Sequence, residues 1–159
     1  MTRGFVILSH VGERNRGNTI AVAGFAVAVI AIAMMAMRRE IFARQPLLIA
    51  VQVLAALLMV WARLTFGLRS FNVAAAPTEG QLVTTGPYRY WRHPIYAAVI
   101  IFVAAAAISH ASWSAAMLAC VVAGGLYLRM RNEEKLLSQQ YPQYREYAAH
   151  TARVIPGLF

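Results

Sequence analysis

The sequence predicts an all-α integral membrane protein with four transmembrane helices and a cytoplasmic helical tail. Its 159 residues are 60% hydrophobic and only 13% charged, and the mean hydropathy is +0.54. A soluble domain carries about a quarter charged residues, so this composition excludes that class. We treat residues 1–159 as a single domain, in which 1–66 hold two N-terminal spans and 67–159 hold a loop, a helical hairpin and a tail.

The first half of the chain predicts two membrane spans after a polar lead-in. Residues 1–17 are basic and too polar to insert, whereas 18–37 carry no charge and are long enough, as a helix, to cross about 30 Å of hydrocarbon. A short loop leads to Pro46, a residue typical of the first turn of a helix, and the second span runs from there to about Thr65. A retained anchor fits better than a cleaved signal peptide, because a second apolar run follows almost at once.

The second half predicts a long loop and then a helical hairpin. Residues 67–93 mix Gly, Pro, Thr, Asn and Arg with short apolar pieces, and loops of this length in compact proteins are usually functional. The next uncharged run, 94–128, is too long for a single span. A polar patch at 109–114 interrupts it, which predicts a tight hairpin of two spans at 94–109 and 113–130.

The distribution of basic residues predicts the orientation. Beyond the hairpin the chain is polar and is expected to be helical to about Gln140 and again over 144–150. With four spans, the N-terminus, the long loop and the tail share one side with eleven Lys and Arg, whereas the other side has only Arg38, Arg39 and Arg44. The positive-inside rule therefore predicts cytoplasmic N- and C-termini. The Ala- and Arg-rich composition indicates a bacterial inner membrane.

Charge and cysteine content exclude two other kinds of partner. The net charge is +9, but the basic residues lie at the ends of apolar runs and form no continuous stripe with interleaved aromatics, so no nucleic-acid partner is expected. The single cysteine, Cys120, allows no disulfide within the chain and no zinc site made of four cysteines, and no metal is expected. Its apolar surroundings predict a buried cysteine that acts as a small hydrophobe.

The first cluster of chemically useful residues covers Gly86 to Tyr96, at the entrance to the hairpin. It contains three tyrosines, one tryptophan, two arginines and His93. Such side chains can stack on a base and hydrogen-bond a carboxylate. The alternative is an interfacial belt of aromatic and basic residues that seats the helix.

The second cluster covers Arg129 to Glu134, at the end of the hairpin. Arg129 and Glu133 are four residues apart, so they share one helical face at the membrane boundary, where a carboxylate is costly without a cationic partner. Such a pair can bind a zwitterion. The alternative is an ordinary anchoring arginine beside a solvated Glu-Glu-Lys face.

Together the clusters form one longer pattern. It reads Leu-Val-Thr-x-Gly-Pro-Tyr-x-Tyr-x-Arg-His-Pro-x-Tyr from Leu82, an uncharged helical hairpin, Arg-x-x-x-Glu-Glu-x-x-Leu from Arg129, and a tail with Tyr141, Tyr144, Tyr147 and Arg153-Val154-Ile155-Pro156. Over roughly residues 67–159 this pattern resembles the isoprenylcysteine carboxyl methyltransferase family, a wider group that includes phospholipid N-methyltransferases. The chain departs from it at Tyr141-Pro142-Gln143-Tyr144, where the tail turn is one residue shorter.

The resemblance implies an enzyme that uses S-adenosyl-L-methionine as cofactor. The cofactor would be bound by Leu82, Val83, Tyr88, His93, Pro94, Ile95, Tyr96 and Glu133. Arg129 would bind the substrate, and Arg129 with Glu133 would be the catalytic residues. The expected partners are the lipid bilayer and a lipophilic methyl acceptor that carries a carboxylate. The alternatives are a phospholipid or amine N-methyltransferase and a small helical membrane protein without enzymatic activity.

Overall fold

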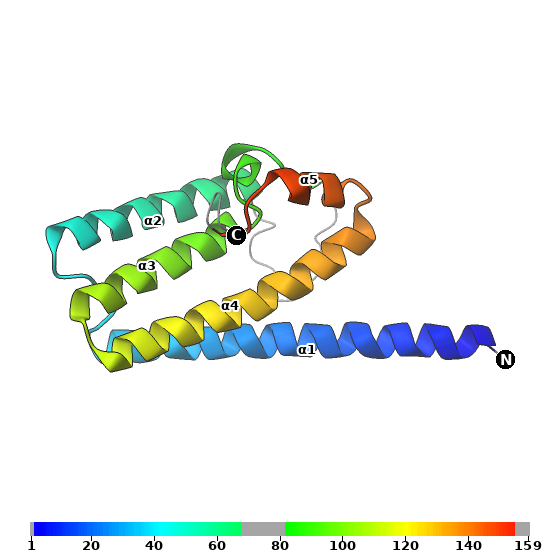
Figure 1. The fold of residues 1–159 in the computed structure, drawn as a ribbon, viewed down its shortest axis with the longest axis horizontal. Coiled ribbons are helices and arrows are strands. Elements are labelled where there is room, and N and C mark those ends of the chain that lie inside the picture. Colours follow the sequence, from blue (N-terminus) through cyan, green and yellow to red (C-terminus); the bar gives the residue numbers. More distant parts are fainter. Residues whose placement is uncertain (1, 68–81, 155–159) are drawn as a thin grey trace.

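The computed structural model describes residues 2–67 and 82–154, with side chains from Gly17 onward. Over these residues the chain is all helical and forms no strand, which confirms the predicted class (Figure 1). The α-helices are α1 (Thr2–Met37), α2 (Pro46–Phe66), α3 (Pro94–His110), α4 (Trp113–Gln140) and α5 (Tyr144–His150), with a 3-10 turn η2 (Gly86–Arg89) before α3. The helices begin and end close to the predicted residues, with one exception. Helix α1 begins at Thr2 and so includes the polar lead-in that was expected to precede the first span.

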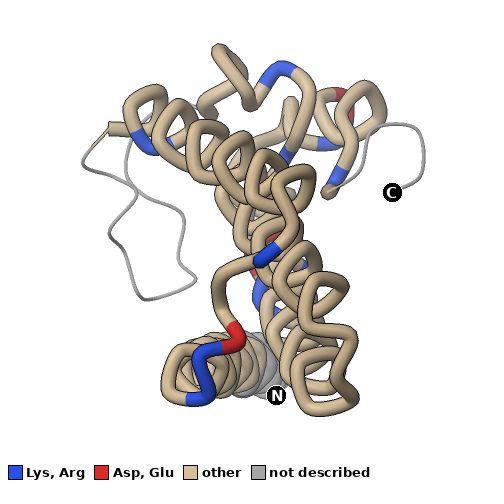
Figure 2. Tube along the Cα trace, turned by 90° about the vertical axis from the view of Figure 1, so that its left-hand side faces the viewer, with Lys and Arg blue, Asp and Glu red and all other residues tan. Residues whose placement is uncertain are grey.

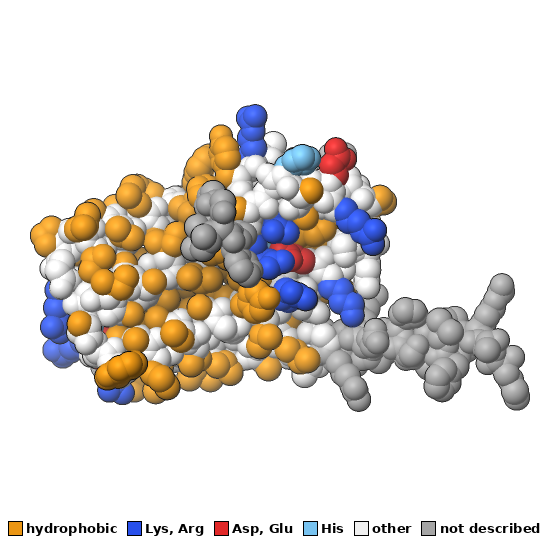
Figure 3. All heavy atoms as spheres, in the orientation of Figure 1, with side chains coloured by type: hydrophobic (Ala, Val, Ile, Leu, Met, Phe, Trp, Pro, Cys, Tyr) orange, Lys and Arg blue, Asp and Glu red, His pale blue; other side chains and the backbone are white. Residues whose placement is uncertain are grey.

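Among the described residues, three helices are long and apolar enough to cross a membrane. They are Gly17–Met37 of α1, Pro46–Phe66 and Trp113–Gln140. The apolar helix α3 has 17 residues, or about 26 Å at 1.5 Å per residue, so the fourth predicted span stays a prediction. Figure 3 shows hydrophobic side chains covering the middle of the molecule and charged ones gathered towards its two ends. Cys120 is exposed on this apolar surface. The expected burial was wrong because Cys120 lies off the face of α4 that packs on α1.

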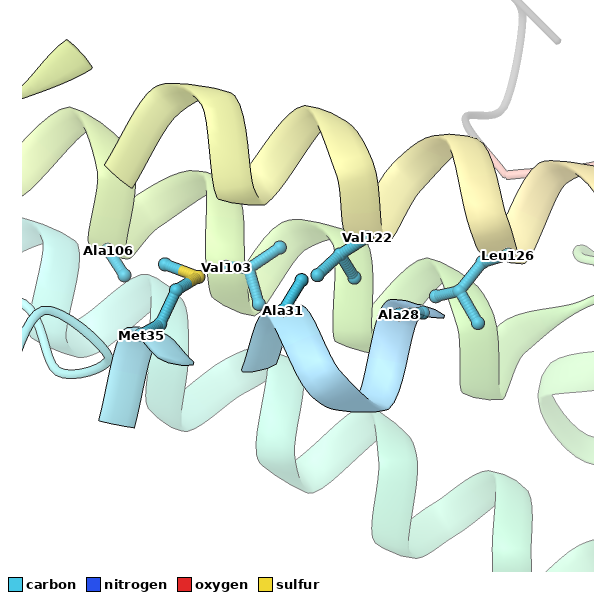
Figure 4. Close-up of a cluster of buried hydrophobic side chains, with 7 residues drawn as sticks. All are labelled: Ala28, Ala31, Met35, Val103, Ala106, Val122 and Leu126. Atoms are coloured by element: carbon cyan, nitrogen blue, oxygen red, sulfur yellow. The ribbon is translucent and has the colours of Figure 1, made fainter. Parts of the chain in front are cut away.

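Close packing of α1 against α4 forms the centre of the bundle. Gly24 and Gly125 face each other at this contact, and a Cβ built on Gly24 would lie 2.9 Å from the Gly125 carbonyl oxygen. Small residues let membrane helices approach in this way. Beside this contact a buried cluster joins α1, α3 and α4, and Figure 4 shows its side chains between the three helices. The cluster consists of Ala28, Ala31, Met35, Val103, Ala106, Val122 and Leu126.

A buried glutamine fixes α2 to its neighbours. The Gln52 amide nitrogen donates to the carbonyls of Ile41 at 2.9 Å and Phe102 at 3.1 Å, and its amide oxygen accepts from the Ala43 backbone at 2.9 Å. A polar side chain inside an apolar bundle is costly unless its hydrogen bonds are made, and here donor and acceptor groups both have partners. Gln52 therefore holds the loop after α1 against the α2–α3 pair.

The predicted polar break between the hairpin helices is a tight turn. Ala111 adopts a left-handed conformation with φ of 49° and ends α3. Ser112 caps α4 by accepting from the Ala115 backbone at 3.1 Å, and Glu40 accepts hydrogen bonds from Ser112 and Ser114, each at 3.1 Å. Figure 2, viewed towards this end, shows the acidic residue beside basic residues in the loop after α1. This polar end lies opposite the end that carries the candidate site.

Candidate active site

The two clusters predicted from the sequence come together where the start of α3 lies beside the second half of α4, with α5 close by (Figure 1). Gly86 opens the 3-10 turn at a φ of 56°, and a Cβ there would lie 2.6 Å from Thr65 Oγ1, so a glycine suits both the backbone and the contact with α2. His93 precedes the helix, and Pro94 occupies its first turn, where a missing backbone N–H costs nothing.

A polar cluster of Tyr96, Arg129 and Glu133 connects α3 to α4. Arg129 Nε lies 3.0 Å from Glu133 Oε1 and 2.6 Å from the Tyr96 hydroxyl, and that hydroxyl donates to Glu133 Oε1 at 2.6 Å. Arg129 is only 3% exposed. The charge of this buried arginine is therefore balanced by a carboxylate one helical turn away, as the spacing predicts.

His93 lies between two carboxylates at the edge of this cluster. Its ring stacks on the Tyr96 ring, with centroids 5.6 Å apart. Nδ1 is 3.7 Å from Glu133 Oε2, and Nε2 is 3.3 Å from Glu134 Oε1. Since the imidazole is only 6% exposed, it links the two glutamates inside the protein.

Glu134 ties the tail to the site, a role that the sequence did not indicate. Arg153 binds the Glu134 carboxylate with both ends of its guanidinium, at 3.0 Å from Nε and 2.8 Å from a terminal nitrogen, and Arg92 approaches it at 3.5 Å. The alternative of a solvated Glu-Glu-Lys face is therefore wrong for this residue. The Arg-Val-Ile-Pro segment was the available signal, because an arginine beside a partly buried site requires an anionic partner.

The tail also docks through its backbone. Ala152 donates to the Tyr90 carbonyl at 3.0 Å and accepts from the Arg92 backbone at 2.8 Å, which makes a parallel bridge between Trp91 and Ala152. The Tyr147 hydroxyl donates to the Tyr88 carbonyl at 2.7 Å. These bonds hold residues that follow the last apolar helix against the segment that precedes α3.

Burial keeps the phenols of this docked tail protonated. It raises the pKa of Tyr147 to about 12, although the nearby Arg92 charge acts in the opposite direction. Burial also raises the pKa of Tyr88 and of Tyr144 above the ordinary value. Neutral phenols remain hydrogen-bond donors at physiological pH, so the contact from Tyr147 to the Tyr88 carbonyl persists there.

We expect alkaline pH to loosen this contact. The unfolded tyrosine ionises near pH 10, and the folded Tyr147 near 12. The folded state therefore binds more protons between these values, and stability falls as pH rises through them. The thermal midpoint measured from pH 9 to 12 should fall less steeply in Tyr147→Phe than in the wild type. Equal slopes would contradict this assignment.

The other predicted cofactor residues differ in burial and in the groups that they contact. Tyr88 is buried, with its ring 5.4 Å from the Phe66 ring, and Pro94 is buried in the first turn of α3. Val83 and Ile95 are half-buried. Leu82 lies on a separate hollow of about 310 Å³ beside α5. That hollow is lined by Leu82, Thr84, Gln143, Glu146, Tyr147 and His150.

Four buried polar atoms of the described residues have no hydrogen-bond partner. Arg92 Nε and the Tyr144 hydroxyl belong to the docked tail region, and Tyr144 is only 4% exposed. Asn18 Oδ1 and Asn132 Nδ2 belong to α1 and α4. Buried polar groups are nearly always paired, so groups left unpaired near a cluster of charges are suited to receive a ligand.

Comparison with known proteins identifies the family. Residues 41–144 match the phospholipid methyltransferase family, so the chain belongs to it, and this family includes the isoprenylcysteine-methyltransferase-like membrane enzymes that the sequence pattern resembles. With its apolar helices, this membership makes the chain an integral membrane protein. The match contains the polar cluster of α3 and α4 but not the membrane-spanning part of α1.

One curated relative is the nickel-cobalt-cadmium resistance protein NccN of Alcaligenes xylosoxydans xylosoxydans. It is 37% identical over 79 residues, which are 49% of this chain and 37% of that protein. The chain thus matches well under half the length of this relative. No solved structure matches the chain.

Proposed function

We propose that the protein is an S-adenosyl-L-methionine-dependent membrane methyltransferase that transfers a methyl group to the carboxylate of a lipophilic acceptor. The observation that carries this proposal is the partly buried cluster of Tyr96, Arg129 and Glu133 between α3 and α4. It places an anion-binding guanidinium and a cation-binding carboxylate side by side, as a reaction between a sulfonium cofactor and an acidic acceptor requires.

The residues present offer partners for both the cationic and the anionic groups of this cofactor. Its ammonium and sulfonium groups are cationic, and Glu133 is the half-buried carboxylate next to the predicted lining residues. Its own carboxylate requires donors, and Arg92 Nε and the Tyr144 hydroxyl are buried donors without a partner. In this assignment the remaining walls of the cofactor site are supplied by Leu82, Val83, Tyr88, His93, Pro94, Ile95 and Tyr96.

Bound there, the cofactor supplies an electrophilic methyl carbon attached to a positively charged sulfur. This carbon would be the group transferred to the acceptor carboxylate, which would need no general base because it is already ionised. Arg129 holds the acceptor oxygen in line, and Tyr96 and Glu133 fix the position of Arg129. Catalysis then arises from alignment in a site with little water.

A second function is methylation of a lipid headgroup amine, and the description of the matching family favours it. An amine must lose a proton before it attacks the methyl carbon. Glu133 is the nearest candidate base, but its Oε1 already accepts hydrogen bonds from Tyr96 and Arg129. Arg129 would then face a cationic acceptor without attracting it. These two points favour the carboxylate.

The proposal places the active end in the cytoplasm of a bacterial cell, with the helices in the inner membrane. The excess of basic residues on that side supports this orientation. The cofactor would enter from the cytoplasm, and the acceptor from the bilayer.

Binding of S-adenosylhomocysteine, the demethylated cofactor, tests the proposal. Calorimetry on detergent-purified protein should show saturable binding by the wild type. The dissociation constant should rise at least about tenfold in Glu133→Gln, because a hydrogen bond to a charged group is lost. Glu40→Gln is the matched control, since Glu40 accepts hydrogen bonds at the opposite end of the bundle. Folded wild-type protein that does not bind would refute the proposal.

A further inference from the structure

An aromatic ring from α1 covers the buried arginine of the site. The centre of the Arg129 guanidinium lies 4.5 Å from the Phe25 ring centroid and 6.0 Å from that of Tyr96. Both distances are within the range of a cation–π interaction. Phe25 lies outside residues 41–144, so it belongs to a part of the site that the family match does not cover.

Helix packing explains why the ring lies there. Phe25 follows Gly24, and Arg129 is one helical turn after Gly125, so both are next to the closest approach of α1 and α4. The absence of side chains at the two glycines brings the backbones together and thereby brings the ring over the guanidinium. The position of Phe25 is consequently fixed by main-chain contact.

Phe25 also lies next to the exposed apolar surface of α1. Arg129 is 3% exposed, whereas Phe25 is half-buried. Its neighbours one turn away on α1, Val22 and Val29, are exposed by 38% and 48% on the apolar surface. α1 and α3 diverge towards this end of the bundle (Figure 1), and Tyr96 on α3 is likewise half-buried.

We infer that Phe25 is a specificity-determining residue for the acceptor, which is a lipophilic molecule whose acidic group reaches Arg129. This inference rests on the proposed function. The acceptor chain would lie against the Phe25 ring, and the carboxylate would bind the guanidinium beyond it. By excluding water, the ring strengthens attraction for an anion, because charges interact more strongly at low dielectric. The same ring gives no comparable gain in affinity to an uncharged acceptor of equal chain length.

Two twelve-carbon probes test this inference on purified protein loaded with S-adenosylhomocysteine. Dodecanoate at pH 8 presents a carboxylate, and dodecanol has the same chain without the charge. The variants are Phe25→Leu, which removes the ring, and Phe25→Tyr, which keeps it. Val29→Ala changes an exposed α1 residue and is the control.

We expect Phe25→Leu to raise the dodecanoate dissociation constant about three- to tenfold, because the smaller side chain would leave the guanidinium more hydrated and weaken its attraction for the carboxylate. Dodecanol and S-adenosylhomocysteine should bind within about twofold of the wild type, and Phe25→Tyr should restore dodecanoate binding. The inference is overturned if Phe25→Leu leaves dodecanoate binding unchanged, if it weakens both probes equally, or if the loaded wild type binds no dodecanoate. Wild-type protein that fails to bind S-adenosylhomocysteine would instead refute the proposed function.

Discussion

Replacing Arg129 by glutamine is expected to reduce methyl transfer to an acidic acceptor about 100-fold or more. Removing one partner of a buried, hydrogen-bonded charge pair across a binding interface costs about 2 to 5 kcal/mol, and in the proposed function the almost fully buried Arg129 pairs with the acceptor carboxylate. Binding of S-adenosylhomocysteine should change much less, because Glu133 keeps its hydrogen bond from Tyr96.

The measurement is transfer of a labelled methyl group from S-adenosylmethionine, with dodecanoate in one series and phosphatidylethanolamine vesicles in the other. Arg129→Lys keeps the charge but not the forked geometry, so it should recover only part of the activity. Arg131→Gln is the control, because Arg131 is exposed on the same helix. Undiminished transfer to phosphatidylethanolamine by Arg129→Gln would show that the acceptor is an amine.

Replacing Gly125 by alanine is expected to destabilise the protein by about 3 kcal/mol, the upper range for overpacking a close contact. The added methyl group would meet the Gly24 carbonyl oxygen. Main-chain atoms cannot rotate away as a flexible side chain can, so the two helices must separate. For a chain of this size the thermal midpoint should fall by about 5 to 10 °C.

The adjacent glycine offers a matched control for this prediction. A Cβ on Gly124 would meet nothing within 4 Å. Gly124→Ala should therefore leave the midpoint unchanged or raise it slightly, since alanine favours a helix over glycine by about 1 kcal/mol. Thermal unfolding of both variants in the same detergent provides the comparison. Equal midpoints would show that α1 and α4 are not in close contact there.

Apolar run lengths and helix punctuation predicted most of the fold. Pro46 begins α2 as predicted, because proline suits the first turn of a helix, and the polar patch at 109–114 forms the predicted turn between α3 and α4. The exposure of Cys120 was not predictable in the same way. A helix that is apolar on all sides gives no period from which to tell its protein-facing side from its lipid-facing side.

The candidate site was predictable where its residues are neighbours along one helix. Arg129 and Glu133 form an i, i+4 pair, and the structure confirms their ion pair. The contribution of Phe25 and the clamp between Glu134 and Arg153 were not predictable, since both depend on the packing of segments far apart in the chain. Contacts between distant segments have no characteristic residue spacing that could be recognised in the sequence.

Because the site includes the docked tail, it is completed late in synthesis of the chain. Residues 144–153 supply Tyr144, Tyr147 and Arg153 to a cluster whose other members precede α3 or lie near the end of α4. A nascent chain that has already inserted its apolar helices still lacks these groups. In the proposed function this end of the bundle can thus hold a ligand only after the ribosome has released this stretch and it has folded back onto the earlier segment.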